Sequence, residues 1–208
     1  GPDNGLTRDA HVVWPNVRRL VSYLAEREEE YILAEYERRE KQSRNVGRHE
    51  KTMEDRLMAV PLRDREDEHY IDPESSGWQT RYYRRLFGVE VGEERRKEIC
   101  TNFLEGLEWT FRYYTTGCPD WRWCYRYDYP PLLTDLLAYT PRLDTAVLEP
   151  GTEGPVTDLV QLSYVLPKSA LHLLPPQLRA KLLSEYGGWY DAEPKFRWAY
   201  CRYFWEAR

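Results

Sequence analysis

The sequence of 208 residues offers little that suits a membrane or a self-contained catalytic site. It has no run of about 18 apolar residues, the length that a membrane-spanning helix needs, so we expect no membrane span and no membrane partner. It lacks the G-x-x-x-x-G-K-[ST] loop that binds nucleotide phosphates and the G-x-S-x-G turn of serine hydrolases. It also has no D-x-D or E-x-E pair at the end of a predicted strand, where carboxylates could share a metal ion. Metal-dependent chemistry would therefore need groups from elsewhere.

Cysteine is scarce, and the four cysteines form no C-x-x-C pair. Cys118 and Cys124 lie six positions apart without neighbouring histidines, so we expect no zinc site. Free thiols suit a reducing compartment, which predicts the cytoplasm, with the nucleus as the alternative.

The charge balance is acidic rather than basic. The formal net charge is −5, so the chain as a whole is a poor nonspecific binder of nucleic acid. Binding to the phosphate backbone needs clustered cations. Any contact with RNA must come from local patches of the surface.

The length predicts one domain, with a second small lobe as the alternative, and the pattern of the sequence divides the chain into three parts. Residues 1–44 contain a long helix that begins near Pro15, with Val17, Leu20, Val21 and Leu24 on one face and the charged residues on a solvated face. Residues 45–77 alternate in charge without a period. We interpret them as a linker or excursion with one short helix at Met53–Ala59.

Residues 78–208 predict a helical region. Ser76 is expected to cap a helix that starts at Trp78 and ends at Gly88 in a left-handed conformation. The arginines of this helix either clamp acidic side chains of a neighbouring helix or hold a phosphate backbone. The candidates for these roles are Arg81, Arg84 and Arg85.

A central helix is predicted from Glu93 to about Thr116. Gly106 inside it costs about 0.5–1 kcal/mol relative to alanine, which indicates close approach of another element. The apolar stripe predicted for this helix, with Leu104 beside it, consists of Ile99, Phe103, Leu107, Thr110, Phe111 and Tyr114.

An aromatic-rich extended stretch follows the central helix. Seven large rings fall within 17 residues: Tyr113, Tyr114, Trp121, Trp123, Tyr125, Tyr127 and Tyr129. Rings of this size are usually buried, so most of them are expected to form a core ribbon. The alternative is that one or two of them line a cleft and stack on a base.

The remaining chain predicts short helices separated by loops. One begins at Pro131, a loop covers residues 141–156, and a further helix stops at Pro167. Two short helices broken at Pro175 and Pro176 follow, and residues 195–208 alternate as in a strand or hairpin. The expected fold is mainly α, with a long N-terminal helix, an aromatic-rich extended segment and a small C-terminal β element.

The stretch from 113 to 135 also resembles the second conserved region of the XRN-type 5′→3′ exoribonucleases, the Xrn/Rat group. That family has a Y-Y-Y-x-G tract, then W-x-W-Y-Y-x-Y-H-Y-A-P, then Ser-Asp. The departures are Cys124 for an aromatic residue, Asp128 for the family histidine and Pro130 for alanine. The matching residues are Tyr113, Tyr114, Gly117, Trp121, Trp123, Tyr125, Tyr127, Tyr129, Pro131, Thr134 and Asp135.

Further blocks extend the resemblance over most of the chain, from the end of the family's first conserved region through most of the second. They resemble the family patterns G-W-x-x-R-Y-Y-x-x-K-F, E-G-L-x-W and P-x-x-Q-L-M-x-V-L-P-x-x-S…L-L-P. The residues concerned are Gly77, Trp78, Arg81, Tyr82, Tyr83, Arg85 and Phe87; Glu105, Gly106, Leu107 and Trp109; and Pro155, Gln161, Leu162, Val165, Leu166, Pro167, Ser169, Leu173, Leu174 and Pro175.

The resemblance implies part of an enzyme that degrades 5′-monophosphorylated RNA. In the family, the acidic cluster that binds Mg²⁺ and the pocket for the 5′ phosphate belong to the first region, upstream of the segments found here. We therefore expect a catalytically incomplete chain that does not itself bind Mg²⁺. Its expected partners are RNA and the catalytic N-terminal region, supplied by the same protein or by a partner chain.

On this view the chain forms the cleft wall that admits single-stranded RNA. The competing interpretations are a nuclease-derived scaffold or protein–protein interaction subunit without activity, and a helical interaction domain unrelated to nucleases. The expected RNA-contacting residues are Trp121 and Trp123 for stacking or strand separation, Arg126 for a phosphate, Tyr125 and Asp128 for support, and Arg81 and Arg85 for the backbone.

Overall fold

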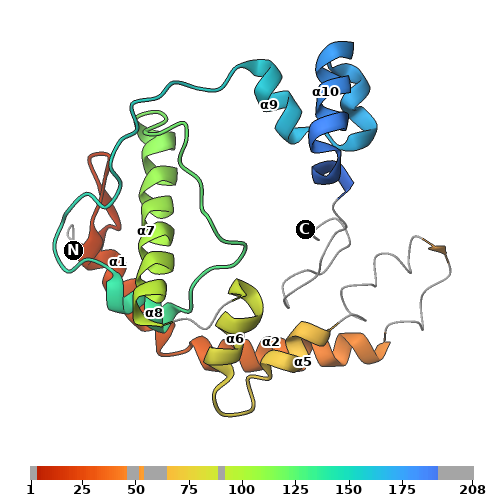
Figure 1. Ribbon diagram of the computed structural model, residues 1–208. Helices are drawn as coiled ribbons and strands as arrows, with labels where there is room; N and C mark the ends of the chain where they lie inside the picture. Colours follow the sequence, from red (N-terminus) through yellow and green to blue (C-terminus); the bar gives the residue numbers. More distant parts are fainter. Residues whose placement is uncertain (1–3, 46–51, 54–64, 89–91, 192–208) are drawn as a thin grey trace.

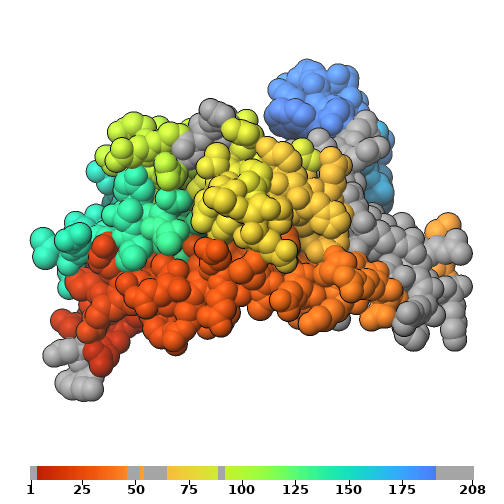
Figure 2. Space-filling view, turned by 90° about the horizontal axis from the view of Figure 1, so that it is seen from below, coloured from red at the N-terminus to blue at the C-terminus, as the bar shows by residue number. Residues whose placement is uncertain are grey.

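The computed structural model describes residues 4–45, 52–53, 65–88 and 92–191, which are mainly helical, as predicted (Figure 1). Helix α7 (Glu93–Thr115) is the longest element of this part and stands over a base of helices that lie across it. The base contains α2 (Glu28–Asn45), α5 (Glu66–Ile71) and α6 (Trp78–Phe87). Figure 2 shows α2 (orange) running beneath α5 and α6 (yellow). No described helix is long and apolar enough to cross a bilayer.

The N-terminal part differs from the single long helix expected. Two short antiparallel strands, β1 (Thr7–Arg8) and β2 (His11–Val12), precede α1 (Trp14–Ala25), and α2 follows after a break at Glu26 and Arg27. The prediction of one continuous helix was therefore wrong. The break places Glu28 beside the first turn of α8 (Leu133–Tyr139), where its carboxylate accepts hydrogen bonds from the backbone N–H groups of Leu133 (2.6 Å) and Thr134 (3.3 Å).

Helix α7 contributes to both apolar cores. Ile99 packs into a core built largely from α6, whereas the adjacent Cys100, together with Leu104, packs against α1 and α8. The first core contains Ile32, Ile71, Trp78, Tyr82, Tyr83, Leu86, Ile99 and Leu132, and the second contains Trp14, Val21, Cys100, Leu104 and Leu136.

The stripe predicted for α7 was only partly right. Ile99 is buried, but Leu107 and Tyr114 are exposed, at 41% and 81%. The face around Cys100, Leu104 and Glu108 is buried instead. Glu108 is tolerated there because its carboxylate accepts hydrogen bonds from the backbone N–H groups of Val147 (2.8 Å) and Leu148 (3.3 Å). The predicted stripe was built from apolar residues, so it could not include the polar Glu108.

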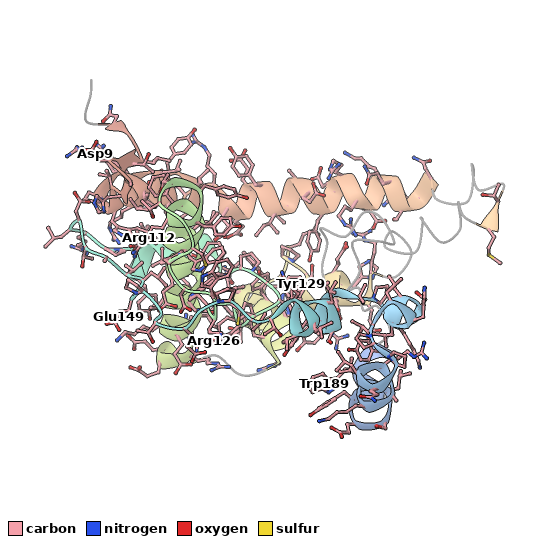
Figure 3. The ribbon with its side chains drawn as sticks, turned by 90° about the horizontal axis from the view of Figure 1, so that it is seen from above. Asp9, Arg112, Arg126, Tyr129, Glu149 and Trp189 are labelled. Carbon is pink, nitrogen blue, oxygen red and sulfur yellow. The ribbon has the colours of Figure 1, made fainter. Side chains whose placement is uncertain are left out.

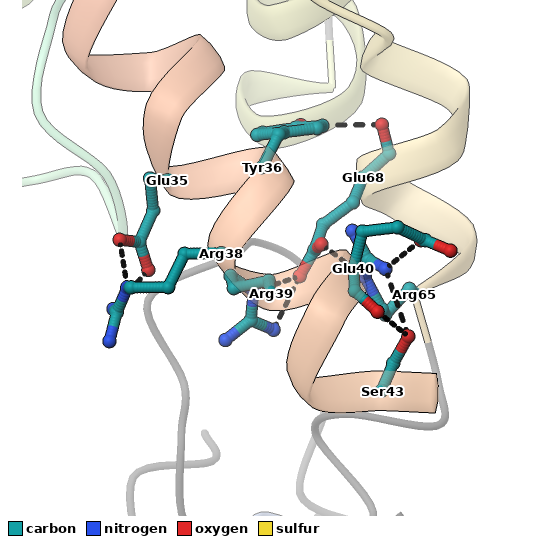
Figure 4. Close-up of polar contacts among 8 residues, drawn as sticks. All are labelled: Glu35, Tyr36, Arg38, Arg39, Glu40, Ser43, Arg65 and Glu68. Atoms are coloured by element: carbon teal, nitrogen blue, oxygen red, sulfur yellow. Dashed lines mark hydrogen bonds and ion pairs between the residues drawn. The ribbon is translucent and has the colours of Figure 1, made fainter. Parts of the chain in front are cut away.

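A buried ion-pair network, rather than apolar packing alone, joins α2 to α5. Arg39 and Glu68 are each only 2% exposed, and their side chains approach to 2.5 Å. Arg65, just before α5, binds Glu68 at 2.6 Å and Glu40 of α2 at 2.6 Å (Figure 4). The expectation of a fully solvated charged face on this helix was wrong at Arg39. Helix α5 itself lies inside the interval interpreted as a linker.

The C-terminal end of α6 agrees with the prediction, whereas its N-terminal end does not. Gly88 ends α6 with φ of 74°, a conformation that strains residues with a Cβ. At the other end Gly77 occupies the cap position with φ of 80° and no side chain caps the helix, so the predicted role of Ser76 was wrong.

The C-terminal helices lie where proline predicted their ends. After the loop at residues 141–156 come α9 (Asp158–Val165), the 3₁₀-helix η2 (Lys168–Leu173), α10 (Pro176–Tyr186) and the 3₁₀-helix η3 (Gly187–Asp191). The predicted β element at residues 195–208 lies outside the described residues, as does most of the short helix expected at Met53–Ala59.

Replacing Glu68 with glutamine should destabilise the base of the molecule strongly. The substitution keeps the shape of the side chain but leaves the buried guanidinium groups of Arg39 and Arg65 without their shared carboxylate. Loss of one partner of a buried pair costs about 3–5 kcal/mol, which urea unfolding followed by circular dichroism would measure. Glu35→Gln is the matched control, because Glu35 pairs with the exposed Arg38 and its loss should leave the midpoint nearly unchanged. Equal midpoints for the two variants would contradict the importance of the buried network.

Candidate nucleic-acid interface

The aromatic segment, residues 118–132, runs back along α7 without forming a strand (Figure 1). Its first part is held by the Trp109 indole, which donates to the carbonyl of Asp120 (2.8 Å), and by Gly151, whose N–H donates to the carbonyl of Pro119 (3.0 Å). Its last part is held by the Tyr82 hydroxyl, which donates to the carbonyl of Pro130 (2.8 Å). Both ends of an irregular segment are thus fixed to helices.

Side chains of the aromatic segment alternate between the protein and the solvent. Extended backbone points successive side chains to opposite sides, and that period of two is kept here. The four inward rings are partly buried, and the four residues that alternate with them, beginning at Arg122, are exposed. The inward residues are Trp123, Tyr125, Tyr127 and Tyr129, and the outward residues are Arg122, Cys124, Arg126 and Asp128.

Trp123 lies directly against Gly106 of α7. A Cβ at position 106 would lie 2.6 Å from Cη2 of the Trp123 ring, so the ring occupies the space that any larger side chain would need. Trp123 also stacks on Trp109 with ring centres 5.8 Å apart, and Trp109 stacks on Tyr113 at 5.1 Å. This confirms the close approach predicted from Gly106 and shows that Trp123 has a packing role.

Tyr125 is likewise directed inward. Its ring meets Phe103 edge to face at 5.7 Å, and its hydroxyl donates to the carbonyl of Tyr129 (2.7 Å). Burial raises the pKa of the Tyr125 hydroxyl, so the side chain stays neutral and remains a donor across the physiological range. Its structural contribution is to hold the turn of the segment from 125 to 129.

Three of the expected contact residues are presented to solvent. The Trp121 ring is 52% exposed, and Arg126 and Asp128 are exposed as well. The backbone of Arg126 is nevertheless fixed, because its N–H donates to Oδ1 of Asn102 (2.9 Å), a side chain only 2% exposed. Figure 3 shows Arg126 and Tyr129 on this segment. A rigid backbone with exposed ring and guanidinium groups suits contact with a flexible strand.

Arg81 and Arg85 bind protein groups instead. The Arg81 guanidinium donates to the carbonyls of Ile71, Asp72, Ser75 and Ser76 at 2.8–2.9 Å, which fixes the turn between α5 and α6. Arg85 forms ion pairs with Asp67 and, at 3.5 Å, with Glu66 of α5. The clamping role that was one of the two sequence-based alternatives is therefore seen for Arg85. The structure does not bring either side chain to the aromatic segment by any contact it records.

Sequence reasoning named Tyr83 and Asp135 as motif residues but missed that they fix the end of the segment. Tyr83 donates to Asp135 (2.6 Å) and accepts from the N–H of Leu132 (3.1 Å), while Arg96 pairs with Asp135 at 3.3 Å. Burial raises the pKa of the Tyr83 hydroxyl. Burial also raises the pKa of Glu28, against the hydrogen bonds it accepts from the start of α8. The available signal was the Thr134–Asp135 step, which matched the family pattern without revealing its role.

Within the described ranges, no group of three or more His, Cys, Asp or Glu side chains is arranged to hold a metal ion. The exposed Trp121 ring and the Arg126 guanidinium offer stacking, hydrogen bonding and positive charge.

A mainly helical domain with a ring-lined extended segment is the class of protein that these features define. Residues 22–195 match the family described as the Xrn1 helical domain, and the chain belongs to that family. Among its relatives are 5'-3' exoribonuclease 2 of Gallus gallus, 36% identical over 53% of this chain, and 5'-3' exoribonuclease 1 of Saccharomyces cerevisiae, 33% identical over 56%. The 5'-3' exoribonuclease 2 of the same yeast is 38% identical over 52% of this chain.

The aligned part is a small fraction of these relatives. It spans 11% of the Gallus gallus protein and 8% and 10% of the two yeast proteins. The chain thus corresponds to a helical portion of 5'-3' exoribonucleases, as the resemblance implied.

Replacing Gly106 with alanine should destabilise the protein, although alanine favours a helix by about 0.5–1 kcal/mol. The added methyl group would overlap the Trp123 ring, which is also held by its stack on Trp109, and such overpacking costs about 1–3 kcal/mol. Thermal unfolding of both proteins checks this. Thr101→Ala, on an exposed position of α7, is the control and should not lower the melting temperature. A Gly106→Ala protein at least as stable as the original would contradict the packing described.

Proposed function

We propose that this chain forms the wall of the RNA cleft in a 5′→3′ exoribonuclease that degrades 5′-monophosphorylated RNA. The observation that carries the proposal is the aromatic segment, whose inward rings fix it to α7 while Trp121, Arg126 and Asp128 face outward. A wall of this kind admits a single strand, because unpaired bases can stack on a ring whereas a duplex keeps its bases covered. Membership of the Xrn1 helical domain family supports the assignment.

The catalytic groups belong to another part of the enzyme in this proposal. An acidic cluster in an N-terminal region of the same protein, or in a partner chain, would hold Mg²⁺, which would supply the means to activate water and to stabilise the leaving oxygen. The role of this chain is to position the strand. Trp121 stacks on a base, Arg126 contacts a phosphate, and Trp123 and Tyr125 hold the segment from behind.

The outward residues differ in the contact that we assign to them. An exposed guanidinium on a backbone fixed by Asn102 can meet a phosphate without ordering a loop first, which lowers the entropic cost of binding. Asp128, exposed two positions further on, carries negative charge and would repel a phosphate. We therefore assign Asp128 to a hydrogen bond with a base or sugar hydroxyl.

Replacing Trp121 with alanine in the complete nuclease that carries this domain should slow the degradation of structured 5′-monophosphorylated RNA. Loss of one base–ring stack costs about 1–3 kcal/mol, or roughly 5- to 150-fold in rate. A single-turnover assay with hairpin and unstructured substrates measures the effect, which should be larger for the hairpin. Tyr31→Ala is a matched control, because Tyr31 is similarly exposed, at 54%, but lies on α2. Equal rates for the Trp121 variant and the original enzyme would refute the stacking role.

Replacing Arg126 with alanine should weaken RNA binding in a salt-dependent way. One phosphate contact fewer reduces the slope of log K against log salt by about 0.7 for a single strand. Fluorescence anisotropy with a labelled single strand over a range of salt concentrations measures this slope in a nuclease with an inactivated metal site. Arg38→Ala, an exposed arginine of α2, should leave the slope unchanged. A weaker binding constant with an unchanged slope would argue against a phosphate contact.

A second candidate function is that of an inactive scaffold or protein–protein interaction subunit. The exposed apolar side chains of α9 and α10, which include Tyr164 at 79% and Val165 at 67%, favour this alternative. Trp121 separates the two functions, since a scaffold has no reason to lose RNA turnover when that ring is removed.

A further inference from the structure

An apolar groove lies between α9 and α10, away from the aromatic segment. Its volume is about 810 Å³, and it is lined by Val165, Leu178, Leu182, Tyr186, Trp189 and Tyr190 among others. In Figure 3 Trp189 lies on these C-terminal helices, apart from Arg126 and Tyr129. The proposed function makes no use of this groove.

The walls of the groove are held together by specific contacts, while its lining is exposed to solvent. The Tyr190 hydroxyl donates to the carbonyl of Ser163 (2.7 Å), which ties η3 to α9 across it, and the Tyr186 and Trp189 rings pack at 4.8 Å. Neither α9 nor α10 has a buried side chain, and Trp189 is 70% exposed. A helix as apolar as α9 normally lies buried, so these helices are built to be covered.

The sequence that follows η3 is rich in large aromatic residues that would gain from burial. Residues 195–208, KFRWAYCRYFWEAR, carry six large rings in 14 residues. Phe196, Trp198 and Tyr200 alternate with Lys195, Arg197 and Ala199, so an extended conformation would gather three rings on one face. Each such ring gains by leaving water, since it hides roughly 150–250 Å² when buried.

Only a few residues of the chain separate the groove from the aromatic residues that begin at Phe196. Residues 189 and 190 line the groove, η3 ends at Asp191, and Phe196 comes five positions later. A short tether of this kind gives an effective concentration in the millimolar range, so even a weak affinity fills the groove. A second copy of the chain would have to compete from a far lower concentration.

We propose that residues 195–205 of this chain dock in the α9–α10 groove, with the rings of Phe196, Trp198 and Tyr200 against its apolar lining. The docked segment completes the C-terminal lobe as a packing unit and covers the apolar face that the second candidate function would leave for a partner. The proposal is independent of any contact with RNA.

Photo-crosslinking within the full 208-residue chain tests the occupant directly. p-Benzoylphenylalanine in place of Trp189 places the reactive group in the groove, and peptide mass spectrometry identifies what it captures. Mixing ¹⁴N- and ¹⁵N-labelled chains separates capture within a chain from capture between chains. We expect crosslinks to residues 195–205 of the same chain. The same group in place of Tyr31, an exposed ring on α2, is the control and should not capture those residues.

Hydrogen exchange gives a second readout that does not depend on the probe. Phe196→Ser, Trp198→Ser and Tyr200→Ser combined should speed amide exchange in α9 and α10 about tenfold, because the groove loses its cover, and leave α7 unchanged. Lys195→Ser, Arg197→Ser and Arg202→Ser combined alter the same segment without removing rings and should leave α9 and α10 as they were. Crosslinks to a second copy or to another part of the chain, or equal exchange in the two variants, would overturn the proposal.

Discussion

The contact of the Trp123 ring with Gly106 of α7 is the constraint on which the candidate interface depends. The missing Cβ leaves room for the outer edge of the indole against the helix, and Trp109 and Tyr113 continue the row of stacked rings. Once Trp123 is fixed, the period of two in extended backbone determines which way the following side chains point. Tyr125 and Tyr127 also turn inward, and Arg126 and Asp128 must turn outward. A packing contact thus determines which side chains can meet a ligand.

Polar contacts join the aromatic segment to the surrounding helices of the described structure. Asn102 fixes the backbone at Arg126, and Tyr83 with Asp135 fixes the end of the segment where α8 begins. Glu28 then ties α2 to that same helix end, and Arg39 and Glu68 tie α2 to α5. Each of these bonds joins residues that are distant in the sequence and replaces water for a partly or fully buried polar group, which is why their loss would be costly.

The proposed division of labour agrees with these observations. A surface that only has to present a ring and a guanidinium benefits from stiffness, since ordering a loop on binding would subtract from the affinity. The groove between α9 and α10 has a different character, because its lining is mostly apolar and its walls are tied together by Tyr190 and Ser163. The two surfaces are therefore assigned to different ligands, a nucleic acid strand and a segment of protein.

Local signals in the sequence were sufficient for several features. Glycine marked the C-terminal end of α6, and proline marked the end of α9 and the start of α10, because each restricts or frees the backbone at its own position. Gly106 correctly indicated close approach, and the spaced rings with their flanking motifs identified the family. The mainly helical class followed from periodicity, which is a property of neighbouring residues.

Only the tertiary structure decided which face of α7 is buried, where the first long helix breaks and what the arginines bind. Arg81 has the same local pattern whether it holds a phosphate or four carbonyls, and the difference lies in the turn after α5 that folds under it. Glu28, Glu68 and Glu108 look like ordinary surface acids in the sequence, yet each binds groups on other elements. A sequence records the spacing of donors and acceptors along the chain, whereas their pairing depends on distances that exist only after the chain has folded.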